Sequence, residues 1–227
     1  MPTKPIRNPG GIIFLIGIFL GLALAIMVIW AAIEAQAYYY TGAVYEPFNG
    51  LHCPLFMTRS ETGTISVTFD NPGNQEINPY YKLETSGPLP QRFENQLSVP
   101  PHTSKSVAWT VDERDIDLGS FIFAQLKILP KEQALCGIFV LNIPGLTGEQ
   151  FFIAALLISL SAIAIGFTLW NRALGNASIN LNRAAQALGV SVLGAMLFAF
   201  IGWTLVGLIF SIIAILLLII LLRFAVA

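Results

Sequence analysis

Ionisable side chains are scarce in this chain. Of its 227 residues, 55% are hydrophobic and only 11% are charged, with two histidines. Three apolar runs, 11–33, 151–170 and 187–222, contain no Asp, Glu, Lys, Arg or His. Ionisable groups inside a membrane mark proton relays and ion paths, and histidine is a usual ligand for haem. This absence argues against a pump, an ion-coupled transporter or a pigment-binding subunit.

The signatures of catalysis and of nucleotide binding are also missing. Phosphate loops, dinucleotide fingerprints and basic nucleic-acid patches do not occur. His52 and His102 each lie near prolines in expected loops, and nothing marks either as a catalytic base. We therefore expect no catalytic residue, no cofactor and no nucleic-acid partner.

The apolar runs that are present predict membrane helices. Residues 11–33 would form a helix of about 34 Å, which spans a hydrocarbon core of about 30 Å. Residues 151–170 form a second span. A cleaved signal peptide is the alternative for the first run, because Ala35-Gln36-Ala37 fits a small-x-small cleavage site.

The third run, 187–222, is too long for one span. A single helix of about 54 Å would need a tilt beyond the usual range. Two helices fit if the chain turns between Phe200 and Thr204, where Gly202 interrupts the run and Trp203 suits an interface. We favour four membrane helices, with three as the alternative.

The charges predict an orientation. Residues 35–150 carry 12 acidic and 7 basic side chains, whereas the other segments carry five basic residues and one acid. Lys4, Arg7, Arg172, Arg183 and Arg223 all flank apolar runs. The positive-inside rule then places both termini in the cytoplasm of a multi-pass plasma-membrane protein. The expected order is cytoplasmic N-terminus and first span (1–34), extracytoplasmic domain (35–150), second span (151–170), cytoplasmic loop (171–186), helical hairpin (187–222) and cytoplasmic C-terminus (223–227).

The extracytoplasmic segment has the period of half-buried strands. Ile65, Val67 and Phe69 alternate with polar residues, and Val107, Trp109 and Val111 do the same. Turn sequences rich in Pro, Gly and Asn separate further short candidates. The expected strands are 54–58, 63–70, 79–86, 92–99, 104–111, 121–129 and 137–143, which together suggest an antiparallel sandwich.

The order of these signals resembles a known family. One strand ends in Asn71-Pro72-Gly73-Asn74, and a later Pro-Pro-His-Thr-Ser-Lys-Ser leads into a strand that carries Trp109. This resembles the immunoglobulin-like (Ig-like) domains of bacterial cell-surface proteins, including the CARDB type. The resemblance implies an all-β Ig-like sandwich that serves as a binding or spacing module. It implies no particular ligand, because such sandwiches host many functions.

The two cysteines predict a disulfide. Cys53 precedes the first clear strand and Cys136 opens the last, as in a single bond that closes an extracytoplasmic sandwich. The alternative is a copper or zinc site made of both cysteines, His52 and His102. Adjacent strand residues point to opposite faces, which makes it hard for His52 and Cys53 to share one ion. We therefore expect no metal site.

An acidic cluster lies between two of the expected strands. It comprises Asp112, Glu113, Asp115 and Asp117, and oxygen-rich loops can hold calcium. The EF-hand spacing is absent, so a solvated turn is the favoured interpretation.

Small residues form a stripe on the first apolar run. Gly17, Gly21 and Ala25 recur every four residues, which places them on one helix face. Small faces let helix backbones approach within a bilayer. The stripe predicts packing against this protein's own later helices. The alternatives are a helix of a partner protein or of a second copy, and a chance arrangement, since Gly is common in membrane helices.

These observations favour a non-enzymatic membrane protein. It would present an Ig-like domain for binding, or act as an accessory subunit of a membrane complex. A transporter or channel component and a membrane-bound enzyme are the alternatives. An enzyme would require a pocket where His52, His102 or the acidic cluster converge.

Overall fold

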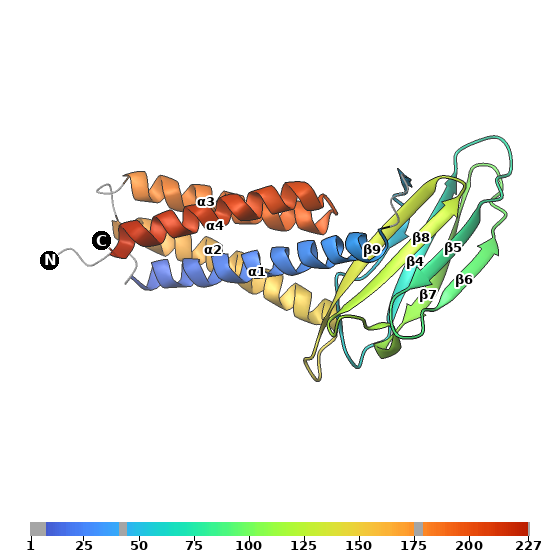
Figure 1. The fold of residues 1–227 in the computed structure, drawn as a ribbon. Coiled ribbons are helices and arrows are strands. Elements are labelled where there is room, and N and C mark those ends of the chain that lie inside the picture. The colour runs from blue at the N-terminus through green and yellow to red at the C-terminus, as the bar shows by residue number, and fades with distance from the viewer. Residues whose placement is uncertain (1–7, 41–44, 175–178, 227) are drawn as a thin grey trace. The chain divides into compact units, whose positions relative to one another are not determined.

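The computed structural model describes residues 8–40, 45–174 and 179–226 (Figure 1). Lys4 and Arg7, on which part of the orientation prediction rests, lie outside these residues. The chain divides into two compact units, one of Met1–Ile29 with Phe152–Ala227 and one of Trp30–Phe151. We call them the helical unit and the sheet unit.

Four helices of the described chain are long and apolar enough to cross a membrane, as the apolar runs predicted. They are α1 (Pro9–Tyr38), α2 (Gly148–Leu174), α3 (Ile179–Phe200) and α4 (Thr204–Val226). The long third run is a hairpin, and its turn lies at Ile201–Trp203. Gly202 adopts a φ of +83° there, which a residue without a side chain does at little cost.

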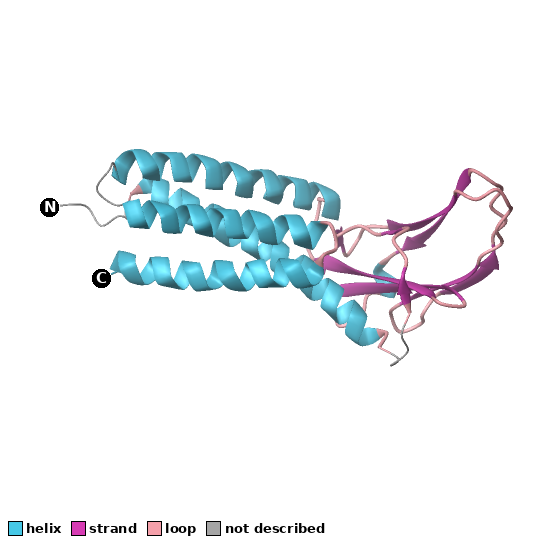
Figure 2. Ribbon diagram, turned by 90° about the horizontal axis from the view of Figure 1, so that it is seen from above, coloured by secondary structure: helices cyan, strands magenta, loops and turns pink. Residues whose placement is uncertain are grey.

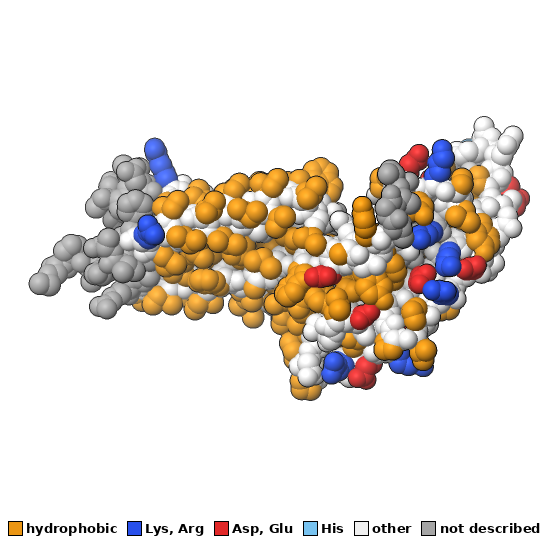
Figure 3. Space-filling model, viewed as in Figure 1, with side chains coloured by type: hydrophobic (Ala, Val, Ile, Leu, Met, Phe, Trp, Pro, Cys, Tyr) orange, Lys and Arg blue, Asp and Glu red, His pale blue; other side chains and the backbone are white. Residues whose placement is uncertain are grey.

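The helices extend beyond the apolar runs at several ends. α3 begins at Ile179, so Arg183 lies in a helix and not in the expected loop. Leu181, Ala184 and Ala185 around it are good helix formers, and Ala185 is buried. Figure 1 shows that α1 begins and α4 ends at the same end of the helical unit, where α2 is followed by α3. Figure 3 shows the visible Lys and Arg side chains of the helices at that end, beyond a hydrophobic surface.

The sheet unit contains two sheets with a common core. The larger sheet has the order β1-β9-β8-β5-β6, with β3 also paired to β9, and the smaller has the order β2-β4-β7. Figure 2 shows the strands of this unit in two layers. The strands are β1 (Glu46–Pro47), β2 (Leu51–His52), β3 (Phe56–Thr58), β4 (Gly63–Asn71), β5 (Tyr80–Thr85), β6 (Arg92–Gln96), β7 (Thr103–Val111), β8 (Phe121–Leu129) and β9 (Glu132–Leu141).

The alternating pattern of the sequence corresponds to the burial of the strands. Ile65, Val67 and Phe69 on β4 are buried. Val67 and Phe69 share a core cluster with Leu83 and Leu126 of the other sheet, and Ile65 shares one with Ile122 of β8. Most neighbouring strands are antiparallel, as expected. β1 and β3, however, pair with β9 in parallel, so the larger sheet is mixed. A parallel pair needs a long crossover, and the chain between β3 and β9 supplies one.

The last turns of α1 belong to the sheet unit. The helix extends past the expected boundary at residue 34, because Ala31 and Ala35 are buried against Phe121 and Phe123 of β8. The hydroxyl of Tyr39, just after the helix, donates to the carbonyl oxygen of Glu84 on β5 at 3.1 Å. One face of the larger sheet is therefore covered by a helical segment and the other by the smaller sheet.

Candidate binding groove

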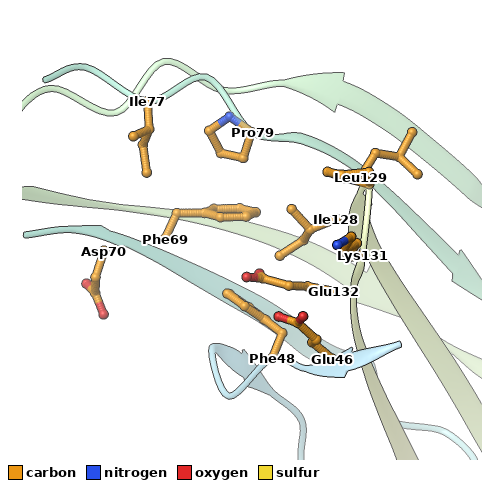
Figure 4. A pocket seen from close by; sticks show the side chains of 11 residues that line it. Glu46, Phe48, Phe69, Asp70, Ile77, Pro79, Ile128, Leu129, Lys131 and Glu132 are labelled. Carbon is orange, nitrogen blue, oxygen red and sulfur yellow. The ribbon is translucent and has the colours of Figure 1, made fainter. Parts of the chain in front are cut away.

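A groove of about 480 Å³ opens at one end of the core of the sheet unit (Figure 4). Phe69 and Ile128 line it and also belong to the core between the two sheets. The lining residues come from β1, β4, β8, β9 and the loops beside them: Glu46, Phe48, Phe69, Asp70, Ile77, Pro79, Ile128, Leu129, Pro130, Lys131 and Glu132. Segments far apart in the sequence thus build one concave surface.

The floor of the groove is aromatic and continuous with the core. The rings of Phe48 and Phe69 lie 5.8 Å apart, and Tyr81 lies 5.5 Å beyond Phe69. Trp109 follows, 5.7 Å from Tyr81 in an edge-on contact. Aromatic pairs at such separations stabilise each other beyond the burial of their surface. The floor is therefore held in place by packing that reaches through the core.

Two carboxylates lie side by side above this floor. Glu46 of β1 and Glu132 of β9 are direct register partners in the parallel pair. The pairing is held by the N–H of Glu46, which donates to the Lys131 carbonyl at 2.8 Å, and by that of Phe48, which donates to Gln133. Figure 4 shows both carboxylates next to each other, close to the ring of Phe48. Like charges placed opposite one another destabilise a sheet.

The carboxylate pair has no salt-bridge partner among the described residues. The salt bridges found in that part of the chain join Lys82 to Glu94, Arg92 to Glu84 and Arg114 to Asp112. Asp70 also lines the groove, but Figure 4 shows its carboxylate pointing away from the pair. Lys131 also lines the groove, but no salt bridge of the described residues joins it to either carboxylate, so the groove combines an apolar floor with a net negative charge.

This combination suits a positively charged group on an apolar stem. Lys and Arg side chains pack their methylene groups along apolar surface while the charged head stays in polar surroundings. A carboxylate pair provides charge-assisted acceptors for such a head, and aromatic rings attract cations. Among the described residues, no three His, Cys, Asp or Glu side chains gather as a metal site would require. The chemistry of the groove is that of cation recognition.

The predicted disulfide is present. Cys53 and Cys136 are bonded, with a Cα–Cα distance of 6.5 Å, and they link the segment after β2 to β9. Because both sulfurs are used in this bond, neither is a thiolate for the alternative copper or zinc site. His52 lies on β2, and His102 contacts Asn74, with 2.8 Å between Nε2 and Oδ1. Neither histidine lines the groove.

The acidic cluster folds into a capped turn. Asp112 precedes a short 3-10 helix (Glu113–Asp115) and accepts from the backbone N–H of Arg114 at 2.9 Å. Hydrogen bonding by the Arg114 side chain lowers the pKa of the Asp112 carboxyl to about 2. Asp115 is buried and accepts from the hydroxyl of Thr85 at 2.7 Å. Asp112 thus accepts from a donor within the turn, and Asp115 accepts from a donor on β5.

The small-residue stripe of α1 meets two other helices. A Cβ on Gly17 would lie 2.7 Å from the backbone nitrogen of Ile163 on α2, and the Ser159 hydroxyl donates to the Gly17 carbonyl at 2.9 Å. A Cβ on Gly21 would lie 2.7 Å from Ser159 Oγ and 2.8 Å from Met196 Sδ on α3. Ala25, the third member, is fully buried.

The sequence alone does not predict the groove in the sheet unit. Its carboxylate pair consists of Glu46 on a two-residue strand and Glu132 directly after a turn. Glu46 carries no local signal, because a strand this short has no readable period. Glu132 lies before residue 137, where the last strand was expected to begin. Only the parallel pairing of β1 with β9 brings the two together.

No family model matches the chain, and no curated protein matches it. Part of it is similar to the β-glucosidase from Listeria innocua in complex with gluconolactone, with TM-score 0.32 and 8% identity over 39% of this chain and 15% of that chain. A Paenibacillus sp. cycloisomaltooligosaccharide glucanotransferase gives TM-score 0.34 and 11% identity over 43% of this chain and 14% of that chain. Red sea bream transglutaminase gives TM-score 0.31 and 14% identity over 43% of this chain and 17% of that chain. The chain spans only about 15% of the first of these, and such TM-scores carry no argument about activity.

Proposed function

We propose that this chain is a multi-pass membrane protein that presents an Ig-like domain outside the cytoplasm and acts by non-covalent binding, alone or as an accessory subunit. The observation that carries the proposal is the groove, in which the Glu46 and Glu132 carboxylates lie over an aromatic floor. Its occupant would be a basic side chain of a partner protein or peptide. In this proposal the protein is not an enzyme.

The strand order supports the Ig-like assignment. In Ig domains one sheet contains strands G, F and C, extended in the variable type by C′, and the other contains A, B, E and D. The sheet β9-β8-β5-β6 follows the first order, and β2-β4-β7 follows A, B and E. The domain departs from the antibody pattern in three respects. The smaller sheet has no counterpart of strand D among the described residues. The domain's disulfide joins Cys53 to β9, and its buried tryptophan, Trp109, lies on β7.

The disulfide and the arginines support the placement outside the cytoplasm. Disulfides persist in oxidising compartments, and the Cys53–Cys136 bond lies within the sheet unit. Arg172 and Arg223 lie in the last turns of α2 and α4, at one end of the helical unit. Under the positive-inside rule, that end faces the cytoplasm.

The binding proposal is tested with a defined basic probe. The full-length protein in nanodiscs is titrated against a fluorescein-labelled Arg-Phe-Arg peptide, and its Glu-Phe-Glu counterpart is the negative control. We expect saturable binding of the basic peptide, weakened at least about tenfold in the Glu46→Gln/Glu132→Gln variant, because hydrogen bonds to charged groups are worth about 1.5–3 kcal/mol. The matched control, Glu113→Gln/Glu149→Gln, removes the same charge at exposed positions outside the groove. Absence of saturable binding, or an equal loss in both variants, contradicts the proposal.

The location is tested by cysteine labelling. A membrane-impermeant thiol reagent should label a cysteine introduced at Asn74 in intact cells, and it should not label one introduced at residue 176 or 227. All three variants should be labelled after the cells are permeabilised. Labelling at residue 227 in intact cells would place the C-terminus outside and contradict the proposed orientation.

A further inference from the structure

A second groove lies in the helical unit, between α1, α2 and α3. Its volume is about 460 Å³. Apart from one glutamine its lining is apolar: Phe14, Leu160, Ile163, Ala164, Phe167, Ala185, Gln186, Gly189, Val190 and Leu193. Among the residues that the structure describes, none of α4 lines the groove, so it lies between the other three helices.

A glycine keeps this groove open. A Cβ on Gly189 would meet no atom closer than 3.8 Å, the distance to the ring of Phe14. The glycines at the contact of α1 with α2 differ, because a Cβ on Gly10 or Gly166 would lie within 2.5 Å of backbone atoms. Those two glycines allow the helices to approach. Gly189 instead leaves space that a larger side chain would fill.

A buried hydrogen-bond donor lies beside the groove. Trp170 on α2 is 1% exposed, and its Nε1 has no hydrogen-bond partner among the described residues. The Trp170 ring lies 5.4 Å from that of Phe14, which lines the groove. A buried N–H without an acceptor destabilises the fold, because it has lost its hydrogen bond to water. An acceptor supplied by a bound molecule would remove that destabilisation.

Polar and cationic side chains continue the groove toward the end of the unit where α2 is followed by α3. Arg183 precedes the lining residue Gln186 by three positions on α3, so both lie on one helix face. Asn171 follows the lining residue Phe167 by four positions on α2. Arg183 and Asn171 are exposed. One arginine therefore lies about one turn beyond the apolar lining, on the face of α3 that contributes Gln186 to the groove.

We propose that this groove binds an anionic phospholipid from the leaflet that faces the arginines. One acyl chain would lie along the apolar lining, and the phosphate would accept from Arg183 and Gln186. The Trp170 indole would donate to an ester carbonyl, at the depth where tryptophan is enriched in membrane proteins. Basic pockets between membrane helices on the cytoplasmic side recognise anionic headgroups in this way. The inference is independent of the groove in the sheet unit.

The test uses native mass spectrometry of the full-length protein, released from nanodiscs that contain equal amounts of phosphatidylglycerol and phosphatidylcholine. The wild type should retain phosphatidylglycerol in preference to phosphatidylcholine. Arg183→Gln should lower this preference about fivefold, which corresponds to about 1 kcal/mol for one arginine near an anionic headgroup. Gly189→Leu should reduce the retention of both lipids. Trp170→Phe, which keeps the aromatic packing, should shorten the retention of phosphatidylglycerol.

Two matched controls separate this site from general effects. Arg223→Gln removes an exposed arginine of α4, which does not line the groove, and Ala154→Leu introduces the same side chain as Gly189→Leu at an exposed position of α2. Neither control should change the preference. Equal retention of the two lipids by the wild type, or equal effects of Arg183→Gln and Arg223→Gln, would overturn the proposal. So would a Gly189→Leu variant that keeps its lipid but loses a co-purifying protein, because the occupant would then be a partner helix.

Discussion

Gly137 of β9 lies against the backbone of Ala31 in α1. A Cβ placed on Gly137 would be 2.0 Å from the carbonyl oxygen of Ala31. No real Cβ makes such a contact, so the helix touches the sheet here only because residue 137 has no side chain. The contact continues through Ala35, Phe121 and Phe123, which form a small buried cluster with Ala31.

Gly137→Ala should therefore loosen the α1 segment from the sheet. Overpacking of this kind destabilises by about 1–3 kcal/mol. Hydrogen exchange of peptides from β8 and β9 should become faster in the variant. Gly73→Ala is the control, since a Cβ there would meet only the Asn71 side chain, at 3.3 Å. Unchanged exchange in Gly137→Ala would show that the helix adapts to the added methyl group without cost.

The disulfide should contribute strongly to the stability of the sheet unit. It closes a loop with a sequence separation of 83 residues, for which the chain-entropy model gives about 4–5 kcal/mol. Cys53→Ala/Cys136→Ala should lower the melting temperature of the unit to that of the reduced wild type. Non-reducing peptide mapping of the wild type should yield one linked pair. Two free thiols in protein isolated from membranes would contradict the bond.

Several features of the fold were predictable from the sequence because their signals are local. The helices follow from runs of apolar residues, and β4 follows from the alternation of Ile65, Val67 and Phe69. The hairpin in the third run followed from its length together with Gly202. In each case the evidence lies within one segment, and tertiary packing reinforces it.

The groove in the sheet unit could not be predicted, for a physical reason. Glu46 and Glu132 meet only because β1 pairs with β9 in parallel, and the register of a distant pair depends on the whole domain. The extension of α1 to Tyr38 likewise depends on contacts with residues distant in the sequence. The sequence predicts that the first span ends at residue 34, because only the folded domain brings Phe121 and Phe123 against Ala35.

The contact between α1 and α2 makes Gly17 sensitive to substitution. A Cβ there would lie 2.7 Å from the backbone nitrogen of Ile163, and backbone atoms cannot rotate aside as a side chain can. Gly17→Ile should lower the melting temperature of the monomeric protein in detergent, with a loss of about 1–3 kcal/mol. Ala154→Ile, at an exposed position of α2, should leave it unchanged. If Gly17→Ile kept full stability but lost a co-purifying subunit, the stripe would serve a partner helix.

The turn that follows β7 should lose stability in acid through Asp112. Its carboxylate accepts from the Arg114 side chain, with 2.8 Å between Nη2 and Oδ2, and from the Arg114 N–H at 2.9 Å. The charged hydrogen bond lowers the pKa from an ordinary value of 3.8 to about 2 in the folded protein. A lowered pKa means that the stabilisation is complete above pH 3.8 and is lost as the pH falls through about 2.

Asp112→Asn isolates this contribution, because it keeps one acceptor oxygen and removes the charge. At pH 7 the variant should show faster hydrogen exchange than the wild type in peptides that cover residues 112–116. The difference should shrink as the pH falls from 3.8 toward 2, once the intrinsic effect of pH on exchange is corrected. Glu113→Gln removes the same charge from an exposed side chain of the turn, and it should not reproduce the effect. If the difference in exchange between Asp112→Asn and the wild type were the same at pH 2 as at pH 7, the charge of Asp112 would not be its cause. The contribution of Asp112 would then come from the shape and hydrogen bonding of its side chain.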